Sequence, residues 1–197
     1  MADEIKTTGN DLNTNRINII HNHKAAQMTI KDIFDAGKYP QLIGVTGQVS
    51  PEFLNKYLAS FVQVELAIGS APNKHHYTSM ENVTKDALAN AMLSTANKTP
   101  IKLFQSLSSQ LQLAAIAGVL KLEVSPTQVI HSRFYLMANP VTKQTRVVLG
   151  SVDLNEPSFD SNGNRFEEVM VFDNDPLYQV LLNRFKKDFR PVLQSYF

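Results

Sequence analysis

The sequence of 197 residues contains no cysteine, so disulfide bonds and thiolate metal ligands are excluded. This absence fits a protein from a reducing compartment. An excess of charge of one sign is also missing, since 19 basic side chains stand against 18 acidic ones. A strongly basic chain would have indicated nucleic-acid binding, and the balanced charge leaves that possibility open.

Long apolar runs are missing as well. The longest, LQLAAIAGVLKL at residues 111–122, falls short of the roughly 20 residues that a membrane-spanning helix needs. The first residues, MADEIKTTGNDLNTNR, have no apolar core behind a basic segment and do not resemble a secretory signal. We therefore expect a cytoplasmic protein without membrane contact.

The polarity of the chain divides it into two parts. Residues 1–27 are rich in polar side chains and carry no apolar period, which predicts a mobile N-terminal arm. Residues 28–197 have the apolar content of one folded domain.

A strand, a helix and a second strand follow one another in the first half of this domain. The apolar run at residues 41–48 predicts a buried strand, and the next one is predicted at residues 62–69. Between them, Ser50 and Pro51 are typical of a helix start, and the apolar residues of 50–61 recur at helical spacing. This order predicts parallel strands joined by a right-handed crossover.

The apolar period predicts the remaining elements. Helices are expected at residues 28–36, 84–95 and 101–118, strands at 119–124, 128–137, 145–152 and 167–173, and a last helix after Asp175. The expected fold is α/β: a mixed, mostly parallel sheet of about six or more strands between helices on both faces.

Polar residues interrupt two of these strands. His131 and Arg133 stand two positions apart, so in a strand they would share one face. Ser151 and Asp153 follow a glycine at the end of the next strand, and Glu167 or Glu168 could reach the same end of the sheet. Arginine matches phosphate oxygens and histidine can attack phosphorus, which makes this set a candidate phosphate site.

The segments HSRFYLM, VVLGSVDL and NRFEEVMVF together resemble the signature of the phospholipase D superfamily. That signature is His-x-Lys on one strand, Gly-Ser-x-Asn after the next, and then an acidic residue. The run LIGVTGQVSPEFLNKYLASFVQVELAIG also resembles nuclease-like members and the phospholipase D-like domains attached to helicases and restriction systems.

The resemblance implies a role for each candidate residue. His131 would be the nucleophile that forms a phosphohistidine, and Arg133 would hold the phosphate in place of the family lysine. Ser151 and Asp153 would occupy the Gly-Ser-x-Asn positions, and Glu167 or Glu168 would orient the histidine. The resemblance implies no metal and no other cofactor.

Three positions differ from the family pattern. Arg133 replaces the lysine, Asp153 replaces the asparagine, and Ala138 stands where the full pattern has an aspartate. The first two changes suggest a salt bridge between Arg133 and Asp153. Two unit charges at ~4 Å attract by roughly 4 kcal/mol at an effective dielectric of ~20, so this bridge would compete with a phosphate for the arginine.

The family site needs two copies of the motif, and the sequence contains one. A working site would therefore form in a homodimer or with a partner lobe. The main hypothesis is a phospholipase D-like phosphodiesterase acting on nucleic acid. The alternative is a catalytically inactive module that binds nucleic acid or a protein partner, such as a helicase or a restriction component. A lipid-head-group phosphodiesterase is the weakest hypothesis, because no membrane-binding helix is evident.

Overall fold

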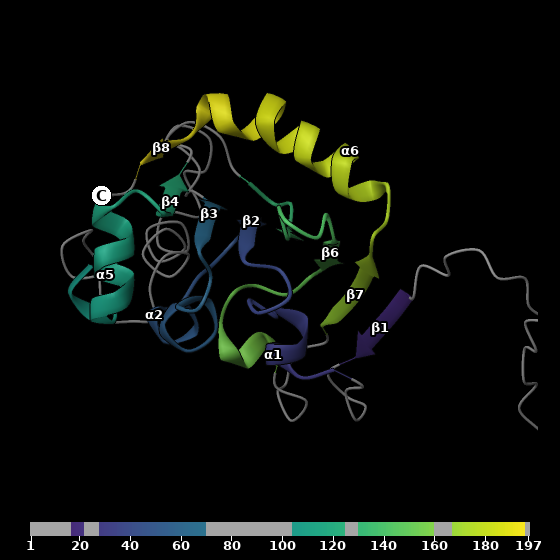
Figure 1. Cartoon of the computed structure of the whole chain (residues 1–197), viewed down its shortest axis with the longest axis horizontal. Coiled ribbons are helices and arrows are strands. Elements are labelled where there is room, and N and C mark those ends of the chain that lie inside the picture. The colour runs from purple at the N-terminus through teal and green to yellow at the C-terminus, as the bar shows by residue number, and fades with distance from the viewer. Residues whose placement is uncertain (1–16, 22–27, 70–103, 125–129, 160–166, 196–197) are drawn as a thin grey trace, which may run out of the picture.

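The computed structural model describes residues 17–21, 28–69, 104–124, 130–159 and 167–195. These residues form one eight-stranded sheet in the order β1-β7-β6-β5-β2-β3-β4-β8. Helix α6 (Leu177–Arg184) lies along one face, while α1 (Ile30–Ile33) and α2 (Pro51–Phe53) lie on the other (Figure 1). The mixed sheet between helices on both faces confirms the expected fold class.

The strands run in both directions. Their bounds are β1 Ile17–His21, β2 Gln41–Thr46, β3 Gln63–Ile68, β4 Leu120–Val124, β5 Phe134–Ala138, β6 Thr145–Gly150, β7 Glu168–Asp173 and β8 Gln194–Ser195. Among these strands, β2–β3 and β3–β4 are parallel pairs and the five other neighbouring pairs are antiparallel. The expectation of a mostly parallel sheet is therefore wrong. One physical reason is that a short hairpin joins β5 to β6, and such a connection leaves no room for a parallel crossover.

The predicted crossover between parallel strands is confirmed. Strand β2 leads through α2 and the π-helical segment η1 (Leu54–Leu58) to the parallel strand β3. The Ser50 hydroxyl accepts a hydrogen bond from the Phe53 amide at 3.1 Å, and proline occupies the first turn, which fixes the helix start. The candidate residues lie near the C-terminal end of β2, from which this crossover starts.

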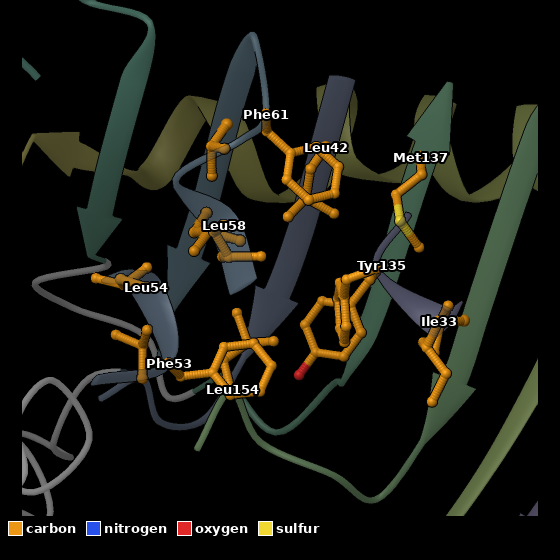
Figure 2. Close-up of a cluster of buried hydrophobic side chains, with 14 of the residues drawn as sticks. Ile33, Leu42, Phe53, Leu54, Leu58, Phe61, Tyr135, Met137 and Leu154 are labelled. Carbon is orange, nitrogen blue, oxygen red and sulfur yellow. The ribbon is translucent and has the colours of Figure 1, made fainter. Parts of the chain in front are cut away.

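Two apolar layers hold the helices to the sheet. The first lies beneath α1, α2, η1 and α5 (Ser109–Ile116), and Figure 2 shows part of it. The second lies beneath α6 and the π-helical segment η3 (Phe185–Phe189). Strand β5 serves both layers by alternation, since Tyr135 and Met137 face the first and Phe134 and Leu136 face the second.

Several predicted boundaries move in the structure. Strand β5 begins at Phe134 rather than at residue 128, and residues 130–133 have no regular structure. The helix expected at 28–36 is reduced to α1, and within 101–118 the helix α5 begins after its cap at Ser108. The helix expected at 84–95 lies outside the described residues.

The N-terminal arm contains a strand that its polar composition did not predict. Residues Ile17–His21 form β1 and pair with β7 at one edge of the sheet (Figure 1). Backbone pairing with β7 needs no apolar period on the added strand, and the mobility of the arm stays a prediction.

The C-terminal segment is tied to the sheet by an ion pair. Arg190, in the 3₁₀ turn η4 (Arg190–Val192), donates to the two carboxylate oxygens of Glu65 at 2.8 and 2.6 Å. The Glu65 side chain is 4% exposed, so its charge depends on this partner. Arg184 makes a longer contact with Asp188, at 3.7 Å, and both of these side chains are exposed. Arg184 and Arg190 are therefore both paired with acids.

Replacing Arg190 with alanine should lower the free energy of unfolding by about 1–3 kcal/mol, because Glu65 would stay buried without its counter-charge. The matched control Arg184→Ala removes an exposed pair and should change stability by less than about 0.5 kcal/mol. Urea denaturation of the two variants checks the difference. Equal losses in both variants would contradict the buried role of the Glu65 carboxylate.

Candidate functional site

The candidate residues meet at the end of the two central strands, where β2 ends and β5 begins. The segment after β6 runs beside the segment after β2, and Val49 and Leu154 form a parallel bridge there. The Ser50 amide donates to the Leu154 carbonyl at 2.9 Å, and the Leu154 amide donates to the Gln48 carbonyl at 3.1 Å. These backbone bonds bring the Gly-Ser-x-Asp segment against the loop at residues 46–48.

Asp153 is the centre of this contact. It is 7% exposed, and its Oδ1 atom accepts hydrogen bonds from the backbone amides of Gly47 at 2.8 Å and Gln48 at 3.1 Å. The Arg133 guanidinium adds two more, from Nε to Oδ1 at 2.7 Å and from Nη2 to Oδ2 at 3.2 Å. Four N–H groups therefore converge on one buried carboxylate.

The suggested salt bridge between Arg133 and Asp153 is present. It is bidentate, and the remaining Nη1 atom of Arg133 donates to the backbone carbonyl of His131 at 3.2 Å. The hydrogen bond to Asp153 is the main cause that raises the pKa of Arg133. The guanidinium is therefore held against the protein and its charge is balanced by a carboxylate.

Gly47 makes room for this guanidinium. A β-carbon at that position would lie 2.7 Å from Nη2 of Arg133 and 3.0 Å from Oδ1 of Asp153. Any larger residue would displace the ion pair. The sequence predicted a strand through residues 41–48, so neither this loop nor its contact with Asp153 was expected.

Tyr135 and Thr46 make hydrogen bonds that hold the same loop and the neighbouring segment. Figure 2 shows the Tyr135 ring in the apolar layer, with its hydroxyl turned away from Met137. That hydroxyl donates to the Val152 carbonyl at 2.8 Å and lies 3.2 Å from the Thr46 hydroxyl, which donates to the Gln48 carbonyl at 2.7 Å. Burial raises the pKa of the Tyr135 phenol, so it stays a neutral donor. No motif or spacing in the sequence marked either residue.

His131 lies just before β5 and is not part of a strand. It precedes β5 by three positions and its side chain is exposed. The expectation that His131 and Arg133 share a strand face is therefore wrong, because the strand begins only at Phe134. Arg133 keeps the orientation that alternation predicts, on the same side as Tyr135.

Ser151 and Glu167 form a second contact. The Ser151 hydroxyl donates to the Glu167 carboxylate and accepts from the Glu168 amide at 3.2 Å. Glu168 is the first residue of β7 and its side chain is exposed. Of the two acids that the sequence left open, Glu167 contacts Ser151 through its carboxylate, while Glu168 contacts the same serine through its backbone.

Gly150 permits the close approach of β6 and β7 at this point. A β-carbon there would lie 2.0 Å from the Glu168 carbonyl oxygen. The glycine of the Gly-Ser pair thus has a steric reason in this fold.

The described ranges contain neither a metal-type cluster nor a membrane span. No three His, Asp or Glu side chains within them gather as ligands of one ion would. In the same ranges, no helix has the length and the apolar character needed to cross a bilayer.

No protein-family model and no curated protein matches this chain. Solved structures do match it, among them the following two. The phospholipase D family member Nuc from Salmonella typhimurium is 13% identical, with a TM-score of 0.54 over 92% of this chain and 97% of that one. The phosphatidylserine synthase of Haemophilus influenzae Rd KW20 is 16% identical, with a TM-score of 0.61 over 98% of this chain and 42% of the synthase. The chain therefore has a phospholipase D-like fold, as its resemblance to that superfamily implied.

Replacing Tyr135 with phenylalanine should lower the free energy of unfolding by about 1–3 kcal/mol, because the buried Val152 carbonyl loses its donor. Tyr57→Phe is the control, since that hydroxyl lies 3.3 Å from a Glu156 oxygen that Lys56 already holds at 2.6 Å. We expect the control to change stability by less than about 0.5 kcal/mol. Thermal denaturation followed by circular dichroism compares them, and an unaffected Tyr135→Phe variant would contradict this support of the loop.

Proposed function

We propose that this protein is a phospholipase D-like module whose phosphodiesterase chemistry is silenced by the Arg133–Asp153 ion pair. The single observation that carries the proposal is the bidentate geometry of that pair on a buried carboxylate. The resemblance to nuclease-like and helicase- or restriction-associated members supports nucleic acid as the ligand class. In this role the module would bind nucleic acid within a DNA-processing or defence system and would not cleave it.

The electrostatics of the pair oppose phosphate binding. A phosphate would have to draw the guanidinium away from Asp153, and breaking a buried, hydrogen-bonded charge pair costs about 2–5 kcal/mol. The Asp153 carboxylate would then face the phosphate with a charge of the same sign. The family pattern has an asparagine there, whose amide can donate to a phosphate oxygen.

A specific observation favours a second candidate, a working phosphodiesterase. The exposed side chain of His131 and the Ser151–Glu167 contact lie at the ends of adjacent strands of this fold. In that candidate an imidazole nitrogen of His131 attacks phosphorus, and a second histidine, supplied by another copy of the chain, protonates the leaving alcohol oxygen. Water that gives its proton back to this second histidine then hydrolyses the phosphohistidine, which releases a phosphate monoester and restores His131.

Restoring the family residues tests the proposal. The double variant Arg133→Lys with Asp153→Asn should gain phosphodiesterase activity of about 10²-fold over the native chain, since one donor in such a site contributes ~10²–10³ in rate. The side-chain carbonyl of the introduced asparagine can still accept from the Gly47 and Gln48 amides, so the loop should keep its conformation. The assay is hydrolysis of bis-p-nitrophenyl phosphate and of a labelled oligonucleotide in EDTA.

Controls separate the two candidate functions. His131→Ala in the double variant should remove the gained activity. A folded double variant that stays inert would show that more than this ion pair silences the site. A native chain as active as the double variant would establish the second candidate instead.

We further propose a twofold homodimer that brings two copies of His131 across one shared interface. Because the chain has no cysteine, His131→Cys places a single thiol beside the expected axis. A short bis-maleimide should cross-link this variant into dimers, whereas Val141→Cys, 85% exposed on the β5–β6 hairpin, should not react in this way. Sedimentation equilibrium checks the native chain, and a monomer at high concentration would contradict the proposal.

A further inference from the structure

The loop at residues 46–48 and the Arg133 side chain have the features of an anion-binding site. Consecutive backbone amides that point at one acceptor are a common cradle for anions, and the planar guanidinium fork matches a planar oxyanion. Here the amides of Gly47 and Gln48 and the Nε and Nη2 atoms of Arg133 all address the same carboxylate. The ligand is a side chain of the protein itself.

The donors are held in place by contacts that do not involve this carboxylate. Backbone bonds join Gln48 to Leu154 and Ser50 to Leu154, and Tyr135 donates to the Val152 carbonyl. The Nη1 atom of Arg133 is anchored to the His131 carbonyl. The amides and the guanidinium should therefore keep their positions when the Asp153 carboxylate is removed.

We propose that Asp153 occupies a built anion-binding site as an internal ligand, and that removing its side chain opens this site to a small planar oxyanion of the carboxylate class. In the native chain the internal carboxylate keeps the site filled and excludes external anions. The inference deepens the proposed function because it concerns the same ion pair, but it is measured by binding rather than by turnover.

The test uses Asp153→Gly, which removes the carboxylate and its methylene, and formate, which has the shape of the missing group. Formate at ten times its dissociation constant should raise the melting temperature of this variant by roughly 3–6 °C over an equal concentration of chloride. The native chain should show no such difference. Amide chemical shifts of Gly47 and Gln48 should move with formate only in the variant.

Two matched variants identify the donors. Asp153→Asn fills the same space with a neutral side chain and should not respond to formate. Asp153→Gly combined with Arg133→Gln removes the guanidinium and should weaken formate binding at least about 10-fold, the loss expected for a charge-assisted pair. Inorganic phosphate, used as a second probe, should bind Asp153→Gly more weakly than formate because it exceeds the space of a carboxylate.

The outcomes decide the proposal in every case. An Asp153→Gly variant that folds but shows no formate response overturns it, as does an equal response in Asp153→Asn. If Asp153→Gly is unfolded, formate should refold it, and failure to refold at any formate concentration also overturns the proposal. If Asp153→Gly binds formate but Arg133→Lys/Asp153→Asn has no activity, the anion-binding proposal stands and only the proposed silencing is rejected.

Discussion

A buried carboxylate must find hydrogen-bond donors and a counter-charge within the fold, and Asp153 shows how much structure this requirement organises. Its partners come from the loop after β2 and from the segment before β5, and it belongs itself to the segment after β6. The side chain of Asp153 is only 9% exposed, so water can hydrate its charge little. These three chain segments therefore meet at a single acidic group, at the end of β2 and the start of β5.

The same physical requirement recurs elsewhere in the sheet. Arg146, 6% exposed, is bidentate to Asp173 at 2.6 and 2.8 Å and lies over the Tyr39 ring at 4.8 Å. Glu65 is held by Arg190 on the face that η4 covers. Each of these buried charges has a bidentate partner, which is the geometry that best offsets the loss of hydration.

The phospholipase D-like fold and the proposed loss of phosphodiesterase chemistry involve different parts of this protein. The phospholipase D-like architecture is kept, including the glycine that lets β6 approach β7 and the serine that follows it. The two residues that would meet a phosphate form a charge pair with each other. A fold hosts many functions, and the one exercised here depends on a few side chains rather than on the sheet.

Local patterns determined much of the architecture. Alternation and helical spacing identified β2 to β7 and the β2–β3 crossover, because side-chain periodicity follows directly from backbone geometry. The pairing of Arg133 with Asp153 was also accessible, since two opposite charges stand where the family motif has a lysine and a neutral asparagine. The family resemblance supplied that matching, and the bare sequence would not have.

Tertiary structure decided the rest. The sequence could not show that β5 starts at Phe134, since a strand with polar side chains on one face could also have included His131 and Arg133. It could not show the antiparallel majority of the sheet, nor β1, because pairing depends on backbone bonds between distant segments. The amide donors of Asp153 lie 106 and 105 residues away, and only the packed sheet brings them to the carboxylate. By itself the sequence determined that Arg133 and Asp153 carry charge. The fold determined that they pair with each other, because a buried carboxylate is stabilised only by a counter-charge and hydrogen-bond donors within the protein.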